Sequence, residues 1–138
     1  SDKPSIHFDA RWFEKPASRL PEAIWFSFSP ITRRDGQWNM DKLGTAISPL
    51  DVIKNGNRKL HAVESGIAYS DQQSRMRIET LDAALVAPGG PSLLNFNNRQ
   101  PNMKNGMHFN LLNNVWGTNF PMWYDDDARF RFNLAIGS

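Results

Sequence analysis

Cysteine is absent from this sequence of 138 residues. Its absence excludes a disulfide framework and any metal site built on thiolates. Long hydrophobic runs are also missing, because no segment approaches the ~20 apolar residues of a membrane-spanning helix. The first ten residues, SDKPSIHFDA, lack the basic and then apolar plan of a signal peptide. We therefore expect no membrane partner. The localisation stays open, with a periplasmic or secreted location favoured.

The sequence also has no large excess of positive or negative charge. Sixteen Lys and Arg residues face fourteen Asp and Glu residues, which leaves a formal net charge of +2. The densest basic pairs, Arg33-Arg34 and Arg58-Lys59, are typical of solvated loops. So small an imbalance does not indicate a nucleic-acid partner.

Sustained helical periodicity is missing too, and the apolar residues alternate instead. In residues 23–29, Ile24, Phe26 and Phe28 share one face, as expected of a half-buried strand. The last strand, residues 129–134, is expected to be central in its sheet, with Phe130 and Phe132 buried. Further strands are predicted at residues 37–40, 61–63, 66–69, 76–81, 92–96 and 108–112, and weak helical candidates at 14–20 and 48–53.

These patterns predict an all-β fold. Seven or eight short strands separated by frequent turns favour an antiparallel β-sandwich with little helix. No repeat, low-complexity segment or linker divides the chain, so residues 1–138 are expected to form a single domain.

The usual signatures of an autonomous enzyme are absent. The sequence has no G-x-S-x-G elbow, no phosphate-binding glycine loop and no dinucleotide fingerprint. His7, His61 and His108 lie far apart, so a zinc site would require them to converge in the fold. The three aspartates at 125–127 lack the alternate spacing of a calcium loop. We predict no catalytic residue, no metal ligand and no cofactor, and leave open whether the chain alone is an enzyme.

Asparagine and tryptophan, by contrast, are abundant and meet in the segment LLNNVWGTNFPMWY, residues 111–124. Carbohydrate sites combine flat rings with amides that bond hydroxyl groups, and this segment supplies both. The alternative is a strand-to-loop corner shaped by Gly117 and Pro121, with Trp116 and Trp123 in the core. Composition alone favours the corner.

Three segments resemble the carboxy-terminal part of a bacterial family of large proteins, of uncharacterised function, related to family 38 glycoside hydrolases of the α-mannosidase type. They are MDKLGTAISPLDVIKNGNRKLHAVESGIAYSD, RIETLDAALVAPGGPSLLNFNN and LLNNVWGTNFPMWYDDDARFRF. The likeness covers about residues 23 to 136, and NNVWGTNFPMW is its most specific portion.

The resemblance implies an amino-terminal catalytic barrel, followed by helical and β-sandwich domains. None of the barrel's metal-binding or nucleophile motifs occurs in this sequence, so the chain would be an accessory sandwich from a larger carboxy-terminal region. Its expected partner is the catalytic domain of the same polypeptide, with carbohydrate as a further candidate. The loop that could reach toward the catalytic pocket supplies the predicted carbohydrate or domain-interface contacts: Asn113, Asn114, Trp116, Thr118 and Asn119.

Two alternatives to an accessory domain stay open. An independent carbohydrate-binding module would expose coplanar Trp side chains, whereas a self-sufficient hydrolase or lyase would bring His61, His108 and a carboxylate into one pocket. Within the loop, Asn113, Asn114 and Asn119 are expected to bond backbone groups. Trp123 is expected in the core and Trp116 at the surface.

Overall fold

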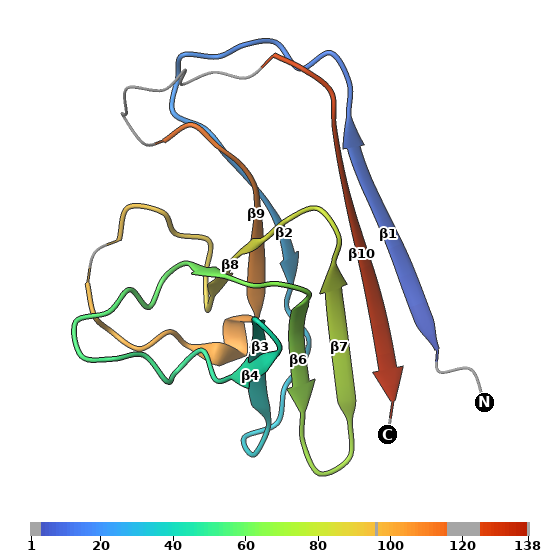
Figure 1. Cartoon of the computed structure of the whole chain (residues 1–138), viewed down its shortest axis with the longest axis vertical. Coiled ribbons are helices and arrows are strands. Elements are labelled where there is room, and N and C mark those ends of the chain that lie inside the picture. Colours follow the sequence, from blue (N-terminus) through green and yellow to red (C-terminus); the bar gives the residue numbers. More distant parts are fainter. Residues whose placement is uncertain (1–3, 96, 116–124, 138) are drawn as a thin grey trace.

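The computed structural model describes residues 4–95, 97–115 and 125–137 (Figure 1). Strands account for 46% of the described residues and helix for 2%, which confirms the prediction of an all-β fold with little helix. The helical content is one 3-10 turn, η1 (Met103–Asn105). No helix in the described part of the chain is long and apolar enough to cross a membrane.

Ten strands form two antiparallel sheets that pack as a sandwich. In spatial order, the six-stranded sheet contains β1 (Ser5–Trp12), β10 (Ala128–Gly137), β7 (Arg75–Thr80), β6 (Gly66–Ser70), β3 (Gln37–Lys42) and β4 (Thr45–Ile47). The four-stranded sheet contains β2 (Ala23–Phe28), β9 (Met107–Asn113), β8 (Leu85–Pro88) and β5 (His61–Ala62).

Strand β10 occupies the predicted central position, between β1 and β7. Its side chains alternate as the sequence predicts, because Phe132 is fully buried while Arg131 faces outward beside Asp9 of β1. Phe130 is only partly buried and lies against Trp12, with ring centroids 5.3 Å apart. The expectation that both phenylalanines are buried therefore holds for Phe132 alone.

The core joins the two sheets through phenylalanine rings. Phe132 of the larger sheet stacks on Phe26 of the smaller one, with centroids 4.8 Å apart and an interplanar angle of 11°. Phe28 meets Phe132 edge-on at 5.8 Å, and Phe109 lies 5.1 Å from it. Such pairs contribute about 0.5–1.5 kcal/mol beyond the burial of their area. Phe132 thus fixes how the two sheets face each other.

Three strands escaped the sequence-based prediction, and one predicted strand is wrong. Residues 92–95 form no strand, because β8 takes the place beside β9 and these residues lie in the connection from β8 to η1. The N–H of Gly89 closes this loop by donating to Gly106 O at 2.8 Å. The strands missed were β1, β4 and β8.

Neither weak helical candidate forms a helix. Residues 14–20 are irregular, and residues 48–53 make only a turn. In that turn Asp51 N donates to Ser48 O at 3.0 Å, and the Ser48 hydroxyl accepts from Leu50 N at 3.2 Å. The serine side chain competes with the backbone pattern that would continue a helix.

Replacing Phe132 tests the assignment of the core. We expect Phe132→Ala to lower the free energy of unfolding by about 3–5 kcal/mol, because it removes a ring packed from both sheets. The matched control is Phe13→Ala, where 68% of the residue is already exposed. Denaturant unfolding measures both changes, and a midpoint for Phe132→Ala close to that of the wild type would contradict this packing.

Candidate functional site

The predicted contact residues lie where β9 ends. Asn113 and Asn114 belong to the described part of the chain, whereas Trp116, Thr118, Asn119 and Trp123 lie outside it. Asn113 behaves as expected of a turn residue, because its Oδ1 accepts from Val115 N at 2.8 Å. This is the local side-chain to backbone bond that the sequence predicts.

Asn114 forms the more extensive set of bonds, and they reach a different segment. Its Nδ2 donates to Ser18 O at 3.2 Å and to Leu20 O at 3.1 Å. Its Oδ1 accepts from Glu22 N, and its own N–H donates to Glu22 O at 3.1 Å. One amide thereby holds the connection between β1 and β2 against the end of β9.

Two large apolar side chains are exposed on this same connection. Phe13 is 68% exposed and Leu20 is 76% exposed. Their backbone is anchored on both sides, because Glu14 N donates to the Asp127 carboxylate at 2.7 Å and Asn114 binds the carbonyl of Leu20. Figure 1 shows the connection between β1 and β2 running beside the chain that leaves β9, at one end of the sandwich.

The described tryptophans do not form an exposed platform. Trp38 is 4% exposed and packs on Tyr69, while Trp12 and Trp25 are partly buried. A flat ring must offer its face to solvent before a sugar can stack on it. These three rings therefore give no support to an exposed tryptophan surface.

The two buried histidines lie on opposite faces of the smaller sheet. His61 pairs with Val86, whose side chain is in the core, whereas His108 pairs with Ala87 on the other face. The structure therefore does not bring them together. Among the residues that it describes, no three His, Asp or Glu side chains are placed to hold a metal ion.

His108 makes a contact that resembles part of a catalytic triad. Its Nδ1 lies 2.7 Å from Ser27 Oγ, across the β2–β9 pair. Its Nε2 is buried without a hydrogen-bond partner among the described residues, so none of their carboxylates orients the ring. A serine nucleophile needs a base that a third group holds in position, and this pair lacks that group.

Burial makes both histidines resist protonation. Burial lowers the pKa of the His61 ring, and the positive charge of Lys42 lowers it further. Burial also lowers the pKa of His108. Both rings therefore bind a proton less readily in the folded chain than in the unfolded chain.

Carboxylates on the outer face of the larger sheet are engaged in ion pairs. Asp9 binds Arg11 at 2.7 Å and Arg129 at 2.8 Å, and these hydrogen bonds lower its pKa well below the usual range. Asp82 binds Arg131 at 2.8 Å, which lowers its pKa as well. A general acid needs a raised pKa, so neither carboxylate is suited to that role.

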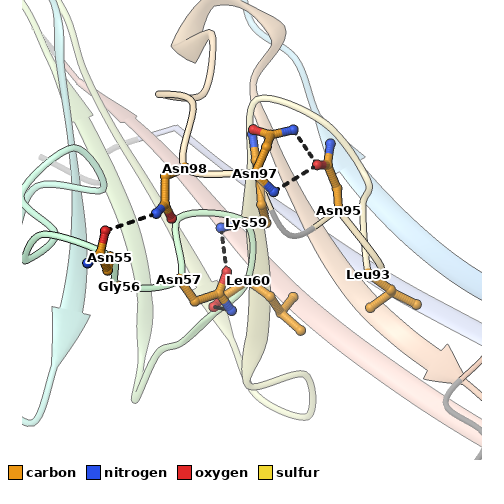
Figure 2. Close-up of a pocket in the computed structure, with 9 residues that line it drawn as sticks. All are labelled: Asn55, Gly56, Asn57, Lys59, Leu60, Leu93, Asn95, Asn97 and Asn98. Atoms are coloured by element: carbon orange, nitrogen blue, oxygen red, sulfur yellow. Dashed lines mark hydrogen bonds between the residues drawn. The ribbon is translucent and has the colours of Figure 1, made fainter.

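The described residues also line a pocket of about 310 Å³ between two loops (Figure 2). One loop precedes β5 and the other follows β8. Five asparagines line the pocket, together with Gly56, Lys59 and two leucines: Asn55, Asn57, Asn95, Asn97, Asn98, Leu60 and Leu93. Glu and Asp are absent from this lining, so its polar groups are almost all neutral amides.

Sequence reasoning did not find this pocket, although it noted the abundance of asparagine. The clusters NGN at 55–57 and NFNN at 95–98 are visible in the sequence. Their convergence depends on β8 pairing between β9 and β5, and β8 was not predicted. Arg58 and Lys59, interpreted as a solvated pair, turn out to bridge the two loops.

Comparison of the chain with protein-family models, with curated proteins and with solved structures finds no match. The functional interpretation therefore depends on the geometry described above and on the sequence.

The depressed histidine pKa values predict an acid-sensitive fold. The unfolded chain carries histidines with a pKa of about 6.5, so it binds more protons than the folded chain below that pH. We expect the free energy of unfolding to fall as the pH is lowered from 7 to 5. Asp9 and Asp82 add to this loss of stability only below about pH 4, where the carboxyl groups of the unfolded chain take up protons.

The double variant His61→Leu/His108→Gln should flatten this dependence, because it removes both buried rings. Urea unfolding at several pH values between 5 and 7 measures the slope. A double variant that keeps the wild-type slope would show that the two buried rings are not its source.

Proposed function

We propose that this chain is a non-catalytic accessory β-sandwich of a glycoside hydrolase-like polypeptide, and that it packs against the catalytic domain of that polypeptide. The observation that carries the proposal is the exposure of two large apolar side chains, Phe13 and Leu20, on the β1–β2 connection that Asn114 holds against the end of β9. The carbonyl of Leu20 accepts a hydrogen bond from Asn114, which belongs to NNVWGTNFPMW, the segment in which the likeness to family 38-type proteins is most specific.

The surface has the properties expected of a face between domains. Exposed aromatic and leucine side chains are characteristic of contact surfaces, where they become buried against a partner. They are carried on a connection fixed by the four hydrogen bonds of Asn114 and by the bond from Glu14 N to Asp127. An ordered apolar surface loses little conformational entropy on docking, which favours association.

The polar residues of the described sandwich support a non-catalytic role. Asp9 and Asp82 are held by arginines, and the Ser27–His108 contact lacks an orienting carboxylate. Glycoside hydrolysis requires two carboxyl groups placed across a cleft, one of them with a raised pKa. In this proposal the catalytic domain supplies those groups.

The alternative of an independent module with a tryptophan platform has less support. Trp38 is buried and Trp12 and Trp25 are partly buried, so the described rings offer no broad exposed face. Among the described residues, the large exposed apolar side chains of the β1–β2 connection are a phenylalanine and a leucine.

Binding to the separately prepared catalytic domain of the same polypeptide tests the proposal. We expect Phe13→Ser/Leu20→Ser to weaken this association at least about 10-fold, because interface anchors typically contribute more than 1 kcal/mol. Isothermal titration calorimetry measures the dissociation constant.

Ile31→Ser is the matched control, since Ile31 is fully exposed and follows β2 at the opposite end of that strand. It should leave the dissociation constant unchanged. Equal weakening by Ile31→Ser, or no association at about 100 µM of each domain, would contradict the proposed docking surface.

A further inference from the structure

The pocket between the loops that flank β5 and β8 has an unusual chemistry. Among the described residues, its lining contains five asparagines, no acidic residue and one cationic group, Lys59. The Lys59 ammonium donates to Arg99 O at 3.2 Å, so its charge is directed at the loop backbone. What remains for a ligand is a set of neutral donors and acceptors. We call this site the asparagine pocket.

Hydrogen bonds between the two loops hold the asparagine pocket open. The guanidinium of Arg58 donates to Val52 O at 3.0 Å within its own loop and to Gln100 Oε1 at 3.2 Å in the facing loop. Lys59 makes the second link, through Arg99 O. The facing loop is closed at its base by the 2.8 Å bond from Gly89 N to Gly106 O. The pocket is therefore largely formed before any ligand arrives, which reduces the entropic cost of binding.

Several amide atoms in the asparagine pocket have no protein partner among the described residues. Asn55 accepts a long 3.5 Å bond from Asn98, which leaves Asn55 Nδ2 and Asn98 Oδ1 unpaired. Asn95 Oδ1 accepts from Asn97, which leaves Asn95 Nδ2 unpaired. An amide can donate twice and accept twice. The pocket thus presents two donor groups and one acceptor group, shown from both loops in Figure 2.

The remaining asparagines shape the loops. Asn57 Oδ1 accepts from Lys59 N at 2.9 Å and its Nδ2 donates to Leu60 O at 3.3 Å. Asn97 Oδ1 accepts from Arg99 N at 3.0 Å. Asn57 and Asn97 therefore stabilise the loops, whereas Asn55, Asn95 and Asn98 keep amide atoms available for a ligand.

We propose that the asparagine pocket binds a neutral sugar. Hydroxyl groups both donate and accept hydrogen bonds, so they match the mixed set of Asn55, Asn95 and Asn98. Leu60 and Leu93 supply apolar surface for the C–H groups of a sugar ring. A volume of about 310 Å³ is at the lower end of small-ligand sites, which suits a single ring better than a long chain.

This inference goes beyond the proposed docking function and does not depend on it. The asparagine pocket is formed by other loops than those that carry Phe13 and Leu20. The docking experiment can therefore fail while the chain still binds a sugar, and sugar binding can fail while the chain still docks.

Side-chain amide signals in NMR spectra of the labelled chain provide the test. Methyl glycosides of glucose, galactose, mannose and N-acetylglucosamine serve as neutral probes, and methyl glucuronide as an anionic one. We expect saturable shifts of the Asn55 and Asn95 amide signals with at least one neutral glycoside. The glucuronide should bind more weakly than that glycoside, because no unengaged cation lines the pocket.

Asn55→Gly, which keeps the positive φ of this position, and Asn98→Leu should each weaken binding about 3- to 10-fold, the range for one lost neutral hydrogen bond. Asn133→Ala, on the outer face of β10, is the control and should leave affinity unchanged. Backbone spectra verify that each variant is folded. No saturable shift at about 50 mM of any neutral glycoside, or variants that bind as tightly as the wild type, would overturn the proposal.

Discussion

The stacked pair of Phe132 and Phe26 is the contact on which the rest of the structure depends. It joins the central strand of the larger sheet to the smaller sheet, at a ring separation of 4.8 Å. Phe28 and Phe109 enclose it from the smaller sheet. Since the sheets are fixed relative to each other here, the loops at their ends are held in place as well. Both proposed surfaces are built on those loops and on the connections between strands.

The polar chemistry of the sandwich is used mainly to hold the fold together. Asp9 of β1 and Asp82 of the β7–β8 connection pair with arginines of β10, and the Asn114 side chain satisfies three backbone groups of the segment that it holds. His61 and His108, whose pKa values are lowered by burial, lie on opposite faces of the smaller sheet. The two surfaces that we propose for recognition carry exposed apolar side chains on the β1–β2 connection and neutral amides in the asparagine pocket. Such a division suits a domain that docks and binds while another domain performs the chemistry.

Alternating apolar and polar residues were enough to predict the all-β class and a position of β10 inside its sheet. In a strand, successive side chains point to opposite faces, so this pattern can be read locally. Strand β8 could not be predicted in this way. Its Leu85, Val86 and Ala87 form a continuous apolar run without alternation, and the Pro88–Gly89 step resembles a loop. The asparagine pocket was missed for the same reason, since its two loops meet only through the pairing of β8. Asn113 could be assigned to a turn from local chemistry, whereas the long-range bonds of Asn114 depend on the packed fold.

The central claim is that this sandwich takes part in recognition and that the reacting groups lie outside it. Hydrolysis of aryl glycosides by the purified chain, with and without added divalent cations, tests that claim most directly. The account predicts no turnover above the uncatalysed rate under either condition. Turnover that a single Asp→Asn change within this chain abolishes, while the variant stays folded, would contradict it.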